Sequence, residues 1–232
     1  MSHYTNIQEV IDTLNNQHTP YLVLRNYDNL LSNEIYMDGH GDIDILCTES
    51  KPIVEALHAK TKHKDQKGLI GDGTHYHIYV SNQPVSIDLR YIGDGYYCDK
   101  WQEEMLKHRV LHKGFYVMDA INHFYSLVYH AILQKNALSE EYQSRLLSMA
   151  AALKISLPSQ DEKGLLKVLE DFMKRNGYTY TYCIDHYIPL QFQKVNKKMI
   201  VLDEERYWKH WKFKVKISFI DLLVKIKHLI LK

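Results

Sequence analysis

The feature that most constrains this chain is the run Asp42-Ile43-Asp44-Ile45-Leu46, in which two acids alternate with apolar residues. Side chains alternate between the two faces of a β-strand, so this run predicts a strand with both aspartates on one face and Ile43 and Ile45 in a core. Two neighbouring carboxylates repel each other. A hard divalent cation such as Mg²⁺ or Mn²⁺ prefers oxygen ligands and removes that conflict.

A third acid follows in a second strand-like run, where Asp88 lies between Ile87 and Leu89. A carboxylate among alternating apolar residues needs a partner. One available partner is Arg90 or another cation. Because the two upstream acids also lack a partner in the sequence, we favour a metal site shared by all three acids, a platform suited to binding phosphates.

An Asp-x-Asp strand followed by a later strand with a single Asp resembles the nucleotidyltransferase superfamily, which shares the fold of DNA polymerase beta. The context, Tyr21 to Asn26 before the acid pair and Ile87 to Arg90 after it, is similar to bacterial nucleotidyltransferase-like proteins associated with surface-polysaccharide genes. The resemblance implies an α+β fold, with a nucleotidyltransferase-like mixed β-sheet and flanking helices, followed by a mainly helical C-terminal region.

The same resemblance implies a metal-dependent transferase that uses ATP or another nucleoside triphosphate. Asp42, Asp44 and Asp88 would be both the catalytic residues and the ligands of Mg²⁺ or Mn²⁺. The transferred group would be a nucleotidyl group, or a terminal phosphoryl group as in a kinase. The acceptor would be a sugar or glycan in polysaccharide biosynthesis. The superfamily usually carries a Gly-Ser pair ahead of the acids, and none precedes Asp42. The alternative is therefore a non-catalytic module that docks to a membrane or a partner.

Four residues beside the acids are expected to contact the nucleotide: Arg25, Asn26, His40 and Gly41. Arg25 ends a strand-like run close to the acids and either contacts a phosphate or is a surface arginine paired with Asp28 or Asp38. His40 lies between two glycines and is either a substrate contact or a turn residue. The loop 91–98 is expected to form one wall of the site.

Element patterns divide the chain into a catalytic domain, 1–118, and a mainly helical region with a basic amphipathic tail, 119–232. Helical spacing predicts a first helix over 2–17. Four residues are expected to be the N-caps of later helices: Ser50, Asp99, Asp119 and Ser139. A further amphipathic helix is expected over 161–176, beginning at Asp161. Gly177 is expected to end the last of these helices. Lys135 is either a phosphate ligand or a solvated surface lysine.

Two further runs predict strands. His75–Val80 and 85–91 form a hairpin through residues 81–84, with His75 and His77 on one face as metal ligands or, more simply, as solvent-side positions. Alternating tyrosines in 178–183 predict a strand of a second small hairpin, whose rings either stack on a ligand or cover one face of the hairpin. The pair Asp185-His186 in the next turn is only a weak indication of a functional site.

The composition fits a cytoplasmic protein. The 232 residues are 45% hydrophobic, which is enough for a packed core. The three cysteines show no zinc or disulfide spacing, as expected in a reducing compartment. The first twenty residues lack the basic start and apolar run of a signal peptide. No apolar run approaches the ~20 residues that span a bilayer.

The charge is distributed unevenly. Residues 194–232 hold eleven Lys/Arg and four Asp/Glu, a net of +7, which leaves −6 for the remainder. An acidic body argues against nucleic acid as a partner, because binding it requires a basic groove. Lysine alternates with aromatic residues over 207–219, which predicts a strand, whereas 217–231 has helical spacing. We expect this tail to contact the inner face of a membrane, to pack on the body as a helix, or to bind nucleic acid or a partner.

Overall fold

The computed structural model describes residues 3–32, 42–61 and 74–230, with only the backbone described at residue 217 and over 220–230. Seven of the described strands form one mixed sheet in the order β3-β4-β5-β2-β1-β7-β6. Their bounds are β1 Tyr21–Val23, β2 Asp42–Cys47, β3 Lys60–Thr61, β4 His75–Val80, β5 Gln83–Tyr91, β6 Val110–His112 and β7 Phe115–Val117. The pairs β2–β5 and β1–β7 are parallel, and the other neighbours are antiparallel.

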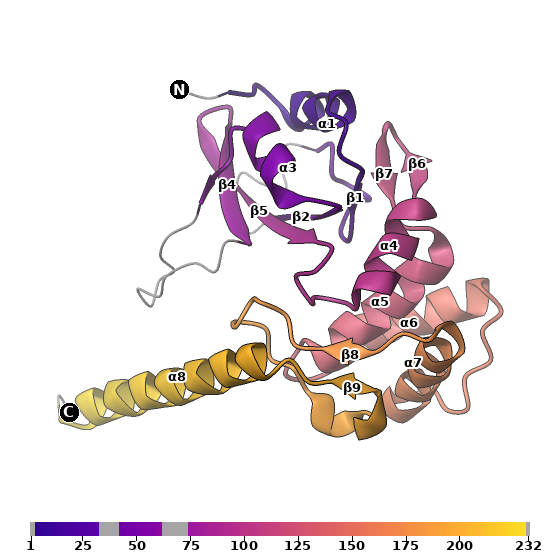
Figure 1. Ribbon diagram of the computed structural model, residues 1–232, viewed down its shortest axis with the longest axis vertical. Helices are drawn as coiled ribbons and strands as arrows, with labels where there is room; N and C mark the ends of the chain where they lie inside the picture. The colour runs from indigo at the N-terminus through magenta and orange to yellow at the C-terminus, as the bar shows by residue number, and fades with distance from the viewer. Residues whose placement is uncertain (1–2, 33–41, 62–73, 231–232) are drawn as a thin grey trace.

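Helices cover both faces of the sheet (Figure 1). On one face α1 (Ile7–Asn16) and α3 (Ser50–Ala56) pack on a core that includes Ile43 and Ile45 of β2. On the other face α4 (Asp99–Lys107) and α5 (Ala120–Leu133) pack on a core that includes Leu46 of β2. The predicted α+β fold, a mixed β-sheet with flanking helices, is therefore confirmed. The alternation of β2 places the face that carries its aspartates toward α4 and α5.

The C-terminal region is mainly helical, as expected. It contains α5, α6 (Glu140–Ala152), α7 (Glu162–Asn176) and α8 (Glu204–Ile230). The expected N-caps at Asp119 and Ser139 are confirmed, because each side chain accepts a backbone N–H of the first turn. Asp161, expected to be the first residue of its helix, is instead the N-cap of α7. Gly177 ends α7 with φ 67°, a left-handed conformation that glycine adopts without strain.

Several expected boundaries are wrong. The first helix begins at Ile7 rather than at residue 2, with Asn6 as its N-cap. Helices α3 and α4 begin one residue early, at Ser50 and Asp99, so neither of these residues is the cap. The β4–β5 hairpin is tighter than expected, because Ser81 and Asn82 with φ 48° and 63° form the two-residue turn.

The second predicted hairpin does not form. Within 178–183 only Tyr180–Thr181 is a strand, β8. It pairs in parallel with β9 (Ile200–Val201), so it has no antiparallel hairpin partner. Tyr178 and Tyr180 are buried in the core around Trp101, where Tyr178 stacks on the indole at 5.5 Å. These two rings fill the core of the helical region, so they offer no face to a ligand.

The predicted strand over 207–219 is also wrong, because these residues belong to α8. Asp203 precedes the helix and accepts the backbone N–H of Arg206, so it acts as a helix cap. Figure 1 shows α8 leaving the body and ending far from the sheet. Among the helices of the described chain, none has both the length and the apolar character needed to cross a bilayer.

Candidate active site

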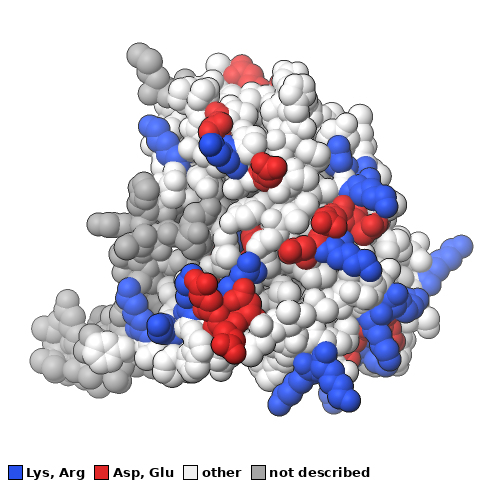
Figure 2. All heavy atoms as spheres, viewed as in Figure 1, with Lys and Arg blue, Asp and Glu red and all other residues white. Residues whose placement is uncertain are grey.

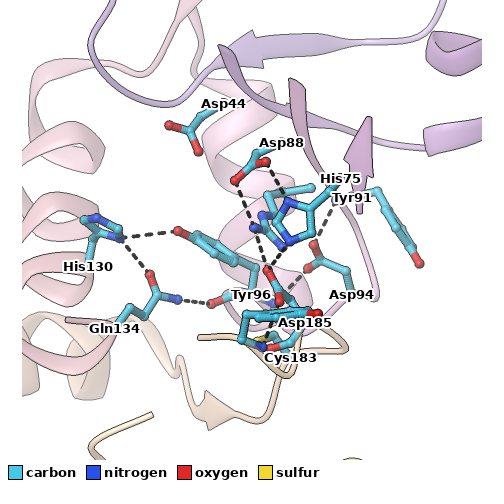
Figure 3. A network of polar contacts seen from close by, with 12 residues as sticks. Asp44, His75, Asp88, Tyr91, Asp94, Tyr96, His130, Gln134, Cys183 and Asp185 are labelled. Atoms are coloured by element: carbon cyan, nitrogen blue, oxygen red, sulfur yellow. Dashed lines mark hydrogen bonds and ion pairs between the residues drawn. The ribbon is translucent and has the colours of Figure 1, made fainter. Parts of the chain in front are cut away.

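The three predicted acids converge. In the parallel pairing of β2 with β5, Asp44 lies opposite Asp88, and Asp42 lies two residues away opposite Ser86. One carboxylate oxygen from each acid lies within 4.8 Å of the others. Alternation places each acid on the same face of its strand, and the pairing of β2 with β5 brings Asp44 and Asp88, 44 positions apart in the chain, close together, as the sequence predicted. Figure 3 shows Asp44 and Asp88 on neighbouring strands.

Asp42 carries the uncompensated charge of this cluster. Partial burial and repulsion from Asp44 and Asp88 raise the pKa of Asp42. Because the Asp42 side chain remains exposed, we attribute more of this rise to repulsion than to burial. Within the described residues no ion pair to Asp42 is found, so a cation at this edge of the sheet would relieve the repulsion.

Asp44 is buried and paired with Arg25. Arg25 Nε donates to Asp44 Oδ2 at 3.1 Å, and Arg25 Nη2 makes a second contact to Oδ1. Burial alone would lower the pKa of Arg25, but the Asp44 carboxylate holds that pKa well above its usual value. The alternative of a surface arginine paired with Asp28 is wrong, because the side chain turns inward from the end of β1 to Asp44. Asp38, the other surface partner considered, lies outside the described residues. Contact with a phosphate remains a prediction.

A second layer fixes the orientation of Arg25. Its Nη1 donates to the Tyr96 hydroxyl and to His130 Nδ1, each at 2.7 Å. Burial and the nearby Arg25 charge lower the pKa of His130 to about 2, so this imidazole is neutral and accepts the hydrogen bond. Gln134 Nε2 donates to the Tyr96 carbonyl at 3.2 Å and ties this layer to α5 (Figure 3).

Asp88 belongs to a cyclic network of four charged side chains. His75 Nδ1 lies 2.7 Å from Asp88 Oδ1, and His75 Nε2 lies 3.2 Å from Asp185 Oδ2. Arg90 Nη2 lies 2.9 Å from the same Asp185 oxygen and 3.5 Å from Asp88 Oδ2. His75 is therefore neither a solvent-side residue nor paired with His77 as a metal ligand, as the sequence suggested, but a bridge between two carboxylates (Figure 3).

The network sets the charges of its members. Burial alone would lower the pKa of His75, but hydrogen bonds to Asp185 and Asp88 raise that pKa to about 10. Burial alone would raise the pKa of Asp88, but the His75 hydrogen bond and the Arg90 charge hold it below its usual value. His75 is thus an imidazolium and Asp88 a carboxylate at neutral pH.

Asp185 is the site residue that sequence reasoning missed. It is 1% exposed, although it lies in a turn nearly 100 residues from β5. The adjacent pair Asp185-His186 was visible in the sequence only as a weak signal. An acid in a polar turn is ordinarily solvated, so its role becomes apparent only once the turn lies beside Arg90.

A cavity of about 260 Å³ opens at these acids. The sheet contributes the three acids, His75 and Arg90, while Arg25 and Asn26 follow β1. The opposite wall consists of Tyr96 from the loop that follows β5 and of residues from the helical region, which are His130, Gln134, Lys135, Tyr142, Asp185, Tyr187, Ile188 and Pro189. Arg25, Asn26 and Lys135 therefore line the site, as does Tyr96 of the expected loop wall. His40 and Gly41 lie outside the described residues.

A larger hollow of about 760 Å³ lies between α7 and the segment that follows α6. Its lining contains none of the three acids, so size alone does not identify the site. The smaller cavity is the candidate active site, because acidic and basic side chains converge there. Figure 2 shows acidic and basic side chains inside the central hollow of the molecule.

The donor set fits a hard divalent cation. Three carboxylates from two strands are the oxygen ligands that Mg²⁺ and Mn²⁺ prefer. His75 binds only one oxygen of Asp88, and hydrogen-bonded carboxylates of this kind are typical of oriented metal ligands. The Arg25 guanidinium competes for Asp44, and this competition sets a limit on the affinity of the site.

Comparison with known proteins leaves the family open. No family model and no curated protein matches this sequence. Among solved structures, the antibiotic-resistance factor ANT(2'')-Ia matches with a TM-score of 0.37 and 10% identity, over 74% of this chain and 91% of that chain. That structure is described as revealing substrate-regulated conformation dynamics. A likeness of this degree carries no argument about activity, which has to be inferred from the geometry of the cavity.

Proposed function

We propose that this protein transfers a nucleotidyl or phosphoryl group from ATP or another nucleoside triphosphate to an acceptor hydroxyl. The observation that supports this most strongly is the convergence of Asp42, Asp44 and Asp88 within 4.8 Å on the wall of a cavity. Arg25 and Lys135 line the same cavity and would bind phosphate oxygens. A divalent cation bound by the acids would neutralise the triphosphate and activate the attacking oxygen.

The residues of the chain would bind the triphosphate, orient the acceptor hydroxyl and accept its proton. The acceptor oxygen attacks the α-phosphorus, a new P–O bond forms, and the bond to the departing pyrophosphate breaks. Attack on the γ-phosphorus instead releases a nucleoside diphosphate. In either case the acceptor hydroxyl loses its proton to Asp88, whose low pKa means that it accepts the proton only as the new bond forms.

The cyclic network positions Asp88 for this role. His75 holds one carboxylate oxygen of Asp88, and Asp185 holds His75 and Arg90 in place. Two buried nitrogens of Arg90, Nε and Nη1, have no hydrogen-bond partner among the described residues. The guanidinium instead lies over the Tyr96 ring, 4.5 Å from its centroid, in a cation–π contact.

For the acceptor, the proposal is a sugar or glycan. The helical wall carries Tyr142 and Tyr187, with Ile188 and Pro189 beside them. Aromatic rings beside hydrogen-bonding groups suit a ring-shaped polar molecule. The link with surface-polysaccharide biosynthesis is supported only by the resemblance of the acid-bearing strands to that group of proteins.

Product analysis by phosphorus NMR tests the proposal. The protein is incubated with Mg²⁺ or Mn²⁺, ATP or CTP, and a panel of hexoses and hexose phosphates. Phosphorus NMR then distinguishes pyrophosphate, the product of nucleotidyl transfer, from a nucleoside diphosphate, the product of phosphoryl transfer. Asp42→Asn and Asp88→Asn should each abolish product, whereas Asp12→Asn, an exposed acid on α1, should not. Turnover that survives loss of either acid would disprove the assignment.

A non-catalytic module is the second candidate, and one observation favours it. Asp44 and Asp88 already have cationic partners, Arg25 for the first and His75 with Arg90 for the second. Thermal unfolding with Mn²⁺ and a non-hydrolysable ATP or CTP analogue separates the two candidates. An increase in Tm that Asp44→Asn abolishes supports the transferase, whereas no shift with any nucleotide supports the module.

A further inference from the structure

Helix α8 exposes an apolar stripe. Trp208, Trp211, Val215 and Phe219 are between 50% and 59% exposed, which is high for side chains of this size. Their spacing of three or four residues places them on one face of the helix. The sequence repeats this spacing at Leu222 and Ile226. Figure 1 shows this helix extending away from the rest of the chain.

A different face of α8 anchors the helix to the body. Arg206 Nη2 donates to the Gly93 carbonyl at 2.7 Å, and His210 Nε2 lies 2.8 Å from the Cys183 carbonyl oxygen. Phe213 packs edge-on against Tyr187 at 4.7 Å. These anchors lie on the opposite side of the helix from the apolar stripe, so the stripe is not used for packing on the body.

Lysines border the stripe on both sides. At 100° per residue, Lys212 and Lys216 lie on one flank and Lys214 on the other, and all three are exposed. From Arg206 to Lys232 the sequence has eight Lys/Arg and a single acid, Asp221. Figure 2 shows basic side chains on the described part of α8, at the lower left.

This charge distribution decides which partner fits. A second copy of α8 would bring two strongly positive helices together, which is unfavourable. Nucleic acid fits poorly, because its phosphates require cations and the apolar stripe offers none. An anionic bilayer satisfies both parts of the surface, because Trp rings reside in the headgroup layer while flanking lysines reach lipid phosphates.

We propose that α8 docks the protein on the surface of an anionic lipid bilayer. The helix lies in the plane of the interface, with Trp208, Trp211, Val215 and Phe219 inserted among the headgroups. This inference does not depend on the transferase activity. The contacts of Phe213 with Tyr187 and of His210 with Cys183 join α8 to the turn that lines the cavity, so docking would place the cavity beside the membrane.

The native tryptophans provide the probe. The chain has three, of which Trp101 is buried and only Trp208 and Trp211 are exposed. The full chain is mixed with phosphatidylcholine vesicles, or with vesicles that also contain phosphatidylglycerol. We expect a shift of the emission to shorter wavelength and co-sedimentation with the anionic vesicles only, and binding that weakens as salt screens the charges.

Two variants of the stripe test the assignment. Trp208→Ser with Trp211→Ser should abolish sedimentation, and Lys212→Glu with Lys216→Glu should weaken it more than tenfold, since each lysine near an anionic surface contributes about fivefold. The matched control is Lys51→Glu with Lys163→Glu, two exposed lysines on α3 and α7. Unchanged circular dichroism melting shows that each variant is folded.

Three outcomes overturn the proposal. The first is no sedimentation of the full chain with either vesicle. The second is an equal loss of binding in the control variant, which would mean a non-specific effect of net charge. The third is an emission shift produced by a duplex oligonucleotide, or by raising the protein concentration alone, in place of the vesicles. These last results would assign the stripe to nucleic acid or to a second copy of the chain.

Discussion

Asp44 and Asp88 lie directly opposite each other in the parallel strands β2 and β5, with Asp42 at the adjacent position on the same face. Such an arrangement is unfavourable without a counter-charge, and only part of that charge comes from the chain. The uncompensated charge of Asp42 therefore lowers the stability of the protein when no ion is bound, as is common at functional sites.

Neutralising Asp42 should accordingly have two effects of opposite sign. Asp42→Asn removes repulsion, so we expect a higher Tm than the wild type when EDTA is present. The same change removes a ligand, so the rise in Tm that Mg²⁺ or Mn²⁺ produces in the wild type should disappear; at a hundred times Kd, that stabilisation is about 2.7 kcal/mol. Differential scanning calorimetry measures both effects. A variant that lost stability in EDTA would show that Asp42 is held by favourable contacts instead.

The Arg25–Asp44 pair should be costly to break. Asp44→Ala leaves the Arg25 guanidinium buried without its carboxylate, and loss of one partner of a buried pair costs about 3–5 kcal/mol. Replacing both residues by leucine should recover much of that loss, because no charge is then left unpaired. Urea denaturation gives the free energies of unfolding. Asp171→Ala, which breaks the exposed pair with Lys167 on α7, should cost less than about 1 kcal/mol.

Asp185 should act through His75 rather than on the substrate. Asp185→Asn removes one of the two anions that keep His75 protonated, so the pKa of His75 should fall from about 10 toward its ordinary value. NMR titration of the imidazole C–H signals reports this directly. We further expect turnover to fall about 10- to 100-fold, the usual effect of losing an orienting partner, while Mg²⁺ still raises Tm. An unchanged His75 titration would contradict this role.

Acid should destabilise the fold through His123. Burial, together with the nearby Arg145 charge, lowers the pKa of His123 to about 4, and its Nδ1 lies 2.8 Å from the Tyr27 hydroxyl. The unfolded chain binds a proton at this residue below about pH 6.5, and the folded chain does so only below about pH 4. The stability that the neutral ring contributes is thus complete above pH 6.5 and is lost as the pH falls toward 4.

The size of this effect is at most about 3 kcal/mol. Free energies of unfolding from urea titrations between pH 7 and 4 measure it as the difference in pH dependence between the wild type and His123→Gln. His18→Gln, which removes an exposed histidine just after α1, is the control for the loss of one surface imidazole. Equal pH dependence in wild type and His123→Gln would exclude His123 as the source.

The sequence predicted the parts of the site that depend on local periodicity. The alternation in 42–46 was enough to assign the aspartates to one face and Ile43 and Ile45 to the core. The apolar flanks of Asp88 placed it on a second strand. The caps at Asp119 and Ser139 followed from side chains that bond to the backbone two or three residues away.

Ion-pair partners could not be predicted from the sequence, because the energies of ion pairs depend on distance in space and on the exclusion of water. Arg25 was expected to contact a phosphate or to pair with a surface acid, yet it lies against Asp44 of the neighbouring strand. His75 was read as a solvent-side position until the turn with Asp185 covered it. Lysine alternating with apolar residues suggested a strand in the tail, but no strand of the described chain pairs with this segment, and a helix satisfies its own backbone hydrogen bonds.

Order along the chain thus determined which residues are acidic, which are apolar and which face of a strand or helix each of them occupies. The tertiary structure alone decided which charges meet, because β2, β5 and the turn at Asp185 come together only when the sheet and the helical region pack against each other. Periodicity is a property of adjacent residues, whereas a charged cavity is formed by residues that folding brings together from distant parts of the chain.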